Sequence, residues 1–269
     1  MKLMLQLPKL GEAQFQQLQR LMHDASGIHL ADNKRTLVAG RLMRRLRHFQ
    51  FTHYDQYLAL IADPAHQRER RLVVDLLTTN ETYFFREHPH FEFLGQWLER
   101  QRTPQRLWSA ACSSGEEPYS LAMVAAEHAR VDWSIVASDL SQSMLAQAER
   151  AIYSMDQSRY FPPGWLRRHC QCGVGEMQGR MRIQANLRSR VHFREVNVIR
   201  PLPDDLGTFD VIFLRNLLIY FEPAQKQDIV RRMVGQLRVG GLLFIGHAES
   251  IHGFDLPLRL AQPSVFERV

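Results

Sequence analysis

The sequence predicts an α/β protein with a doubly wound, mostly parallel sheet, preceded by a small all-helical domain and interrupted by a small antiparallel β insertion. Residues 107–126 have the pattern of a buried strand, a tight turn and a helix, which is the first unit of a doubly wound sheet. Strand-like and helix-like segments then alternate to residue 268. Residues 1–77, in contrast, show helical periodicity only.

The composition is that of a globular protein in a reducing compartment. The chain of 269 residues is 45% hydrophobic, and no apolar run approaches the roughly 18 residues that span a bilayer. Residues 1–11 make a poor signal peptide because Pro8 and Lys9 break their apolar run, and three cysteines in this length indicate the cytoplasm. We therefore expect a cytoplasmic protein without direct membrane insertion. We also expect it to be a monomer, although the sequence carries no signal for the oligomeric state. Its net charge of +6 suits an acidic partner, either protein or nucleic acid.

The domain at residues 1–77 is predicted to form helices whose apolar residues recur at helical spacing: 12–25, 34–49, 54–62 and 68–77. The second helix carries cations and no acid, namely Lys34, Arg35, Arg41, Arg44, Arg45 and Arg47. Such a face is often merely solvated. Uncompensated cations repel one another, however, so the alternative is a docking surface for an acidic partner. Its candidate docking residues are Arg41, Arg44 and Arg45.

Residues 78–90 are expected to link the helical domain to an α/β domain at 91–269. Polar groups stand among three aromatic residues in Thr78–Glu87, which is unusual for a plain linker. One interpretation is an N-capped start of the helix that runs through residues 91–98. The other is a wall over a ligand site, with Asn80, Thr82 and Arg86 reaching the ligand.

The turn after the first strand is the predicted ligand site. It has one glycine, Gly115, rather than the three of a dinucleotide fingerprint, and no Gly-Lys-Ser/Thr of a P-loop follows it. Glu116 and Glu117 already supply the negative charge that a helix N-terminus attracts. A phosphate is therefore disfavoured, and a cationic nucleoside such as S-adenosylmethionine (AdoMet) fits. The alternative is an ordinary strand, turn and helix with solvated glutamates.

Asp139 ends the second predicted strand, Trp133–Ser138, and follows Gly115 by 24 residues. An acid at about this interval binds the ribose hydroxyls in nucleotide sites. It could instead cap the helix predicted from Gln142, or do both.

The remaining chain alternates between strands and helices after one interruption. Residues 160–190, approximately, are rich in glycine and proline, which indicates the inserted β-subdomain. Further strands are expected at 192–196, 209–214, 242–245 and 264–268, with a helix at 223–237. Asn197 follows the first of these strands, and Arg215 with Asn216 follows the second.

Few residues are arranged for metal or acid–base chemistry. Cys170 and Cys172 lie two apart beside His169, but no second ligand cluster accompanies them, so no metal is expected. No Ser-His-Asp set is apparent near the turn, and His247 is a possible but unnecessary base.

The chain resembles the CheR-type chemotaxis receptor methyltransferases, which are AdoMet-dependent protein-glutamate O-methyltransferases. The stretches that carry the resemblance are Thr78–Glu87 (TTNETYFFRE), Trp108–Met123 (WSAACSSGEEPYSLAM), Ala137–Ala151, Phe209–Phe221 (FDVIFLRNLLIYF) and Gly240–Ser250 (GGLLFIGHAES). The resemblance implies a class I AdoMet methyltransferase fold. It also implies methyl transfer to glutamate carboxylates of methyl-accepting chemotaxis receptors, which yields glutamate methyl esters and S-adenosylhomocysteine during adaptation in chemotaxis signalling.

The same resemblance implies which residues bind AdoMet, namely Asn80, Thr82, Arg86, Glu117, Asp139, Asn197, Val198, Arg215 and Asn216. Glu117 would meet the ammonium group and Asp139 the ribose. Arg86 and Tyr220 would be catalytic, with Tyr220 near the reacting methyl group. The partner would be the cytoplasmic domain of the receptor, docked on the basic helix, and not a nucleic acid.

Two other functions are alternatives. A nucleic-acid methyltransferase would suit the positive charge, but its usual Asn/Asp-Pro-Pro-aromatic motif is replaced here by residues 216–220, which contain no proline. A non-catalytic AdoMet-sensing module would be expected to lose Arg86 or Tyr220, and both are present.

Overall fold

The computed structural model describes residues 8–269, and the chain divides into two units between Thr79 and Asn80. The expectation that residues 1–11 form no signal peptide falls largely outside the described residues. No helix within residues 8–269 combines the length and the apolar character that a membrane crossing would need. Each unit has its own core of buried apolar side chains.

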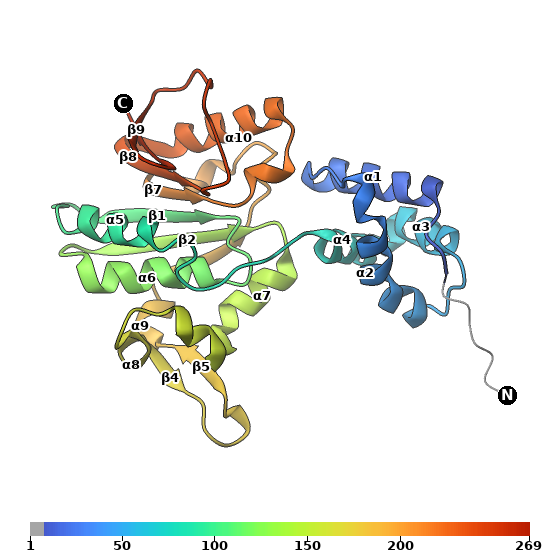
Figure 1. Cartoon of the computed structure of the whole chain (residues 1–269), viewed down its shortest axis with the longest axis horizontal. Helices are drawn as coiled ribbons and strands as arrows, with labels where there is room; N and C mark the ends of the chain where they lie inside the picture. The colour runs from blue at the N-terminus through green and yellow to red at the C-terminus, as the bar shows by residue number, and fades with distance from the viewer. Residues whose placement is uncertain (1–7) are drawn as a thin grey trace. The chain divides into compact units, whose positions relative to one another are not determined.

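The first unit is all-helical from residue 8 to residue 79, as predicted (Figure 1). Its helices are α1 (Glu12–Ser26), α2 (Arg35–His48), α3 (Tyr54–Ala62) and α4 (Gln67–Leu77). A short 3₁₀ turn at Asp32–Lys34 precedes α2, so this helix begins one residue later than expected. The core is formed by apolar side chains from the inner face of each helix, among them Phe15, Leu42, Tyr57 and Val73.

Two of the arginines predicted to form a docking face hold this helical unit together. Arg45 makes a two-pronged ion pair with Glu69, with Nε–Oε1 and Nη2–Oε2 distances of 2.7 Å, and the Tyr57 hydroxyl donates to the same carboxylate at 2.7 Å. Arg41 donates to the carbonyl oxygen of Thr78 at 2.7 Å and to those of the two residues before it. Those carbonyls lie at the end of α4, where a helix leaves its acceptors unsatisfied.

The second unit is built on a seven-stranded sheet within residues 80–269, in the order β6-β2-β1-β7-β8-β10-β9. In chain order the strands are β1 (Gln105–Ala110), β2 (Trp133–Asp139), β6 (Val191–Glu195), β7 (Phe209–Leu214), β8 (Leu237–Ile245), β9 (Leu258–Gln262) and β10 (Val265–Arg268). The first five strands of the spatial order are parallel, and β10 pairs antiparallel with both β8 and β9. The predicted mostly parallel, doubly wound sheet is confirmed.

Helices cover the sheet in the alternating pattern that the sequence indicated. They are α5 (Pro89–Leu98), α6 (Glu116–His128), α7 (Gln142–Arg150) and α10 (Pro223–Gln236). Helices α5 and α6 pack side by side over the sheet (Figure 1). The strands beneath are apolar on both faces, and β7 is buried along its whole length, which is the pattern of a parallel strand with covered faces.

The predicted antiparallel insertion is a separate three-stranded sheet in the order β3-β5-β4. Its strands are β3 (Ile152–Ser154), β4 (Cys170–Cys172) and β5 (Arg180–Ile183). The sheet begins before residue 160, because Ala151 adopts a left-handed conformation that ends α7 and turns the chain directly into β3. Short helices α8 (Trp165–His169) and α9 (Ala185–Arg188) flank it.

The ion pair at Glu69 gives a first prediction. Burial alone would raise the pKa of Glu69, but its bonds to Arg45 and Tyr57 outweigh burial and hold that pKa below its usual value of 4.5. We expect Glu69→Gln to lower the free energy of unfolding by about 1–3 kcal/mol at pH 7. The difference in unfolding free energy between the two proteins has its full value above pH 4.5. It disappears as the pH falls through the lowered pKa of Glu69, because the wild-type carboxyl is then protonated and uncharged like the amide of the variant.

Denaturant unfolding of the full chain at several pH values measures this difference. The matched control is Glu12→Gln, which removes the carboxylate of an exposed ion pair with Arg35 and should cost less than about 1 kcal/mol. Equal losses in the two variants would show that the Glu69 carboxylate contributes no more than a surface charge.

Candidate cofactor-binding and active site

The carboxyl ends of three adjacent parallel strands converge at one edge of the sheet. Strand β1 lies between β2 and β7, so the turn at residues 111–115, Asp139 and Arg215 follow neighbouring strands on the same side. Ligands of doubly wound sheets bind at this edge. The sequence analysis predicted a ligand site at this edge of the sheet, and the fold brings most of the candidate residues to it.

The turn after β1 is held in an unusual conformation. Ala111, Ser113 and Gly115 have φ values of 65°, 49° and 96°, and the first two adopt a left-handed conformation that costs energy for residues other than glycine. A Cβ on Gly115 would lie 2.7 Å from the hydroxyl of Tyr153, which itself donates to the Ser114 carbonyl at 2.8 Å. Glycine is therefore required at position 115.

Asp139 fastens this turn to the end of β2. Its Oδ2 accepts from the backbone N–H of Ser113 at 2.8 Å, and its Oδ1 accepts from that of Ser141 at 2.9 Å. The side chain of Ser141, rather than that of Asp139, caps α7 by accepting from the N–H of Met144. A carboxylate oxygen has two acceptor positions, so Asp139 can hold the turn and still accept from a ligand hydroxyl.

The two glutamates at the start of α6 have separate environments. Glu116 is buried and accepts from the Ser114 hydroxyl at 2.6 Å, and burial raises the pKa of its carboxyl. Glu117 lies toward the strand ends, where it accepts from the Ser109 hydroxyl at 2.7 Å and from Arg215 at 3.1 Å. Burial raises the pKa of Glu117 even though the Arg215 charge opposes it.

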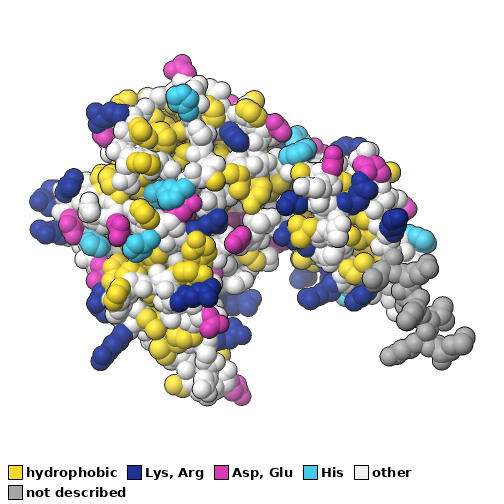
Figure 2. Space-filling view, in the orientation of Figure 1, with side chains coloured by type: hydrophobic (Ala, Val, Ile, Leu, Met, Phe, Trp, Pro, Cys, Tyr) yellow, Lys and Arg dark blue, Asp and Glu magenta, His cyan; other side chains and the backbone are white. Residues whose placement is uncertain are grey.

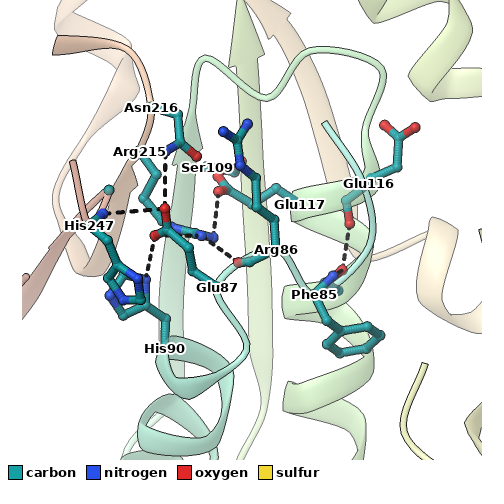
Figure 3. Close-up of polar contacts among 12 residues, drawn as sticks. Phe85, Arg86, Glu87, His90, Ser109, Glu116, Glu117, Arg215, Asn216 and His247 are labelled. Carbon is teal, nitrogen blue, oxygen red and sulfur yellow. Dashed lines mark hydrogen bonds and ion pairs between the residues drawn. The ribbon is translucent and has the colours of Figure 1, made fainter. Parts of the chain in front are cut away.

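The guanidinium of Arg215 is shared by two carboxylates at the centre of the site (Figure 3). Its side chain is 1% exposed, and its Nη1 and Nη2 lie 3.1 Å from Glu117 and 2.9 Å from Glu87. Burial by itself would raise the pKa of Glu87, but Arg215 and Asn216 outweigh burial and lower it. Two carboxylates around one guanidinium leave negative charge at this point, which favours a cationic guest.

Glu249 holds the loop that follows β7. Its carboxylate accepts from three backbone N–H groups: those of Asn216 at 2.9 Å, Leu218 at 2.6 Å and Gly246 at 2.6 Å. Asn216 has a positive φ of 57° and donates through its side chain to Glu87 at 3.1 Å. Glu249 thereby ties the loop after β7 to the loop after β8. Sequence reasoning gave no role to Glu87 or Glu249, although both lie within the motifs that carried the family resemblance.

The segment at residues 80–87 runs along the turn and α6. The carbonyl of Asn80 accepts from the Ser113 hydroxyl at 3.1 Å, and the Phe85 N–H donates to the Ser120 hydroxyl at 3.0 Å. Arg86 donates to the carbonyl of Glu81 at 2.8 Å. Thr82 is half-buried in the same segment. This arrangement favours the interpretation of the segment as a wall beside the ligand site.

The remaining candidates follow the outer strands. The N–H of Val196 donates to the carbonyl of Asp139 at 3.1 Å, so Asn197 and the buried Val198 follow β6 beside the end of β2. Tyr220 is half-exposed and ends a 3₁₀ turn after β7. On the insertion, His169 bonds to Glu127 at 2.7 Å beside the two cysteines of β4. The roles of Asn197, Val198 and Tyr220 toward AdoMet stay predictions.

Comparison with known proteins gives matches over both units. Residues 80–265 match the family described as "CheR methyltransferase, SAM binding domain", and residues 13–78 match "CheR methyltransferase, all-alpha domain". A chemotaxis protein methyltransferase of Escherichia coli (strain K12) is 37% identical over 96% of this chain and 91% of its own length. A chemotaxis protein methyltransferase of Salmonella typhimurium is 38% identical over 96% of this chain and 90% of its own length. The chemotaxis protein methyltransferase 2 of Pseudomonas aeruginosa is 37% identical over 92% of this chain and 90% of its own length.

The contacts of Glu249 predict how the loop after β7 responds to a conservative change. Glu249→Gln presents an amide N–H₂ to backbone N–H groups, so at least one of the three bonds is lost. We expect the unfolding free energy to fall by about 1–3 kcal/mol and the Leu218 amide to exchange faster with solvent. Hydrogen exchange measured by mass spectrometry, with exposed Glu176→Gln as the control, tests this. Unchanged protection of the Leu218 amide would contradict it.

Proposed function

The chain belongs to the CheR methyltransferase family, and we propose that the residues around Arg215 hold AdoMet for transfer of its methyl group to receptor glutamates. The chain is an AdoMet-dependent methyltransferase of chemotaxis proteins. The observation that carries the residue assignment is the buried Arg215 between Glu87 and Glu117, at the carboxyl ends of the strands. This cluster lies within the stretch that matches the SAM-binding family description.

The transfer is a single displacement in which atoms and charge balance. Bound AdoMet would supply an activated methyl group: a carboxylate oxygen of the receptor glutamate would bond to the methyl carbon as the carbon–sulfur bond breaks, with S-adenosylhomocysteine as the neutral leaving group. Glutamate is already ionised at neutral pH, so no proton has to be removed. The residues of the site must therefore orient the two reactants and exclude water, and His247 is not needed as a base.

Electrostatics supports the placement of the cofactor. AdoMet carries two positive charges, on its ammonium and its sulfonium. The two negative charges of Glu87 and Glu117 exceed the single positive charge of the guanidinium that they share. We assign the ammonium to Glu117 and the ribose hydroxyls to Asp139. Asn80, Thr82, Asn197, Val198 and Asn216 would line the rest of the cofactor. We also propose that Arg86, a half-exposed residue whose guanidinium donates to the carbonyl of Glu81, meets the incoming carboxylate.

The partner that we propose is the cytoplasmic domain of a methyl-accepting chemotaxis receptor, with the enzyme acting as a monomer in the cytoplasm. Lys and Arg side chains gather on the visible face of the helical unit (Figure 2). On α2, Arg44 and Arg47 are exposed, whereas Arg41 and Arg45 are engaged within the unit. We therefore revise the docking set to Arg44 and Arg47. Nucleic-acid methylation and non-catalytic AdoMet sensing are not favoured by the family membership.

Tyr220 provides a test of the catalytic assignment. We expect Tyr220→Phe to keep the fold and AdoMet affinity but to slow methyl transfer at least about tenfold, equivalent to about 1.4 kcal/mol of transition-state stabilisation. The physical reason is loss of a hydroxyl that orients the substrate carboxylate beside the methyl group. Single-turnover methylation at saturating AdoMet and receptor measures the rate. A wild-type rate would remove the hydroxyl from the mechanism, and a loss of cofactor affinity alone would make Tyr220 a binding residue.

Charge reversal on α2 tests the docking surface. Arg44→Glu with Arg47→Glu should depress receptor methylation and leave AdoMet affinity nearly unchanged, because the proposed cofactor residues all lie in the other unit. Receptor association of the wild type should weaken with added salt through screening. The matched control is Arg20→Glu with Arg70→Glu, which makes the same charge change at exposed positions on α1 and α4. Equal methylation by the two double variants would show that the α2 face has no special role.

A further inference from the structure

Beside the proposed cofactor residues lies a cluster of three side chains of metal-ligating types, two of which, His90 and His247, have no role in the proposed methyl transfer. Within residues 8–269, Glu87, His90 and His247 form a group whose potential ligand atoms all lie within 4.8 Å of one another. Glu87 comes just before α5, His90 lies in its first turn, and His247 follows β8. Figure 3 shows the two imidazole rings next to each other beneath the Glu87 carboxylate.

His90 is the member of this cluster that most needs a partner. Its side chain is 1% exposed, and its Nδ1 lies 3.4 Å from the Oε2 of Glu87, but neither ring nitrogen has a hydrogen-bond partner among the described residues. A buried polar group without a partner is unfavourable. A neutral imidazole offers one ring nitrogen with a free lone pair, which is the atom that binds a metal ion.

The distances suit a tetrahedral ion. Zinc ligands lie about 2.0–2.1 Å from the metal, which sets neighbouring donor atoms about 3.3 Å apart. The Nδ1 of His90 and the Oε2 of Glu87 are already 3.4 Å apart. The rings of His90 and His247 meet edge to face with centroids 4.7 Å apart. His247 is exposed, so its side chain can turn toward the ion and gives the cluster access to solvent.

We propose that Glu87, His90 and His247 form a binding site for a divalent transition metal ion of the zinc class. Two imidazoles and one carboxylate leave a fourth position for water, and imidazole ligands select such ions over magnesium and calcium. Arg215 competes for Glu87, with a distance of 2.9 Å to Oε2. It also has Glu117 as a second partner, so it stays paired when the metal takes Glu87.

The charge of a bound metal ion predicts antagonism with the cofactor. Without metal, Glu87 and Glu117 outnumber the Arg215 guanidinium, and a cationic guest is favoured. A divalent ion on Glu87 reverses that balance and repels the ammonium and sulfonium of AdoMet. This consequence rests on the proposed cofactor site, whereas metal binding itself does not.

Zinc titration of the full chain, with any purification tag removed, tests the site. We expect about one zinc ion per chain to be taken from a chromophoric chelator. His247→Ala should weaken that zinc affinity at least about tenfold, because one of three protein ligands is lost. His252→Ala is the matched control, because it removes an exposed imidazole from the same loop. His90→Gln tests the buried ligand. His247→Ala is the deciding variant for zinc binding, because His247 is exposed and its replacement leaves the core intact.

Equal zinc affinity in wild type and His247→Ala overturns the proposal, and so does the absence of measurable binding in both. AdoMet affinity with and without zinc tests the antagonism. Zinc should weaken AdoMet binding at least about tenfold in the wild type and have less effect in His247→Ala. If zinc binds but AdoMet affinity is unchanged, the metal site stands and the antagonism is wrong. If AdoMet fails to bind even without zinc, the proposed cofactor site fails while the zinc result is still decisive.

Discussion

The buried guanidinium of Arg215 is the contact on which the site depends. A charge taken from water is tolerated only when it is paired and hydrogen-bonded. This one is paired with Glu87 before α5 and with Glu117 at the start of α6, and its Nε is the one guanidinium nitrogen without a partner among the described residues. The rings of Phe91 and Phe213 lie against it, with the guanidinium carbon 5.5 Å and 5.6 Å from their centroids. Arg215 thereby joins three segments that are far apart in the sequence.

The same principle extends outward through carboxylates that bind backbone. Asp139 accepts from the turn after β1, and Glu249 accepts from the loops after β7 and β8. In both cases a buried or half-buried acid fixes a strained segment, one with left-handed residues at Ala111 and Ser113 and the other with one at Asn216. Carboxylates that bind backbone N–H groups thus shape the site, and one of them, Asp139, is also the proposed ligand of the ribose.

The parts of the structure that local pattern determines were predictable from the sequence. The strand, turn and helix around Gly115, the alternating elements after it and the helical first unit all have clear periodicity. Contacts between side chains that only the folded structure brings together were not predictable from the sequence. Nothing local distinguishes Arg45, which pairs with Glu69, from its exposed neighbour Arg44. The pairing of Glu87 with Arg215 likewise spans more than a hundred residues. Strands β3 and β9 are short, and β9 is largely exposed, so their weak apolar patterns gave no signal.

Tyr153 gives the insertion a part in the architecture of the site. This residue lies on β3, is 4% exposed, and donates to the carbonyl of Ser114 while its hydroxyl fills the space beside Gly115. Its ring also packs edge to face on Phe84 of the wall segment. The small sheet is consequently not a detachable appendage. A chimera that exchanged it for the equivalent segment of another protein would have to carry a tyrosine at this position, or the turn after β1 would lose the hydroxyl that supports it.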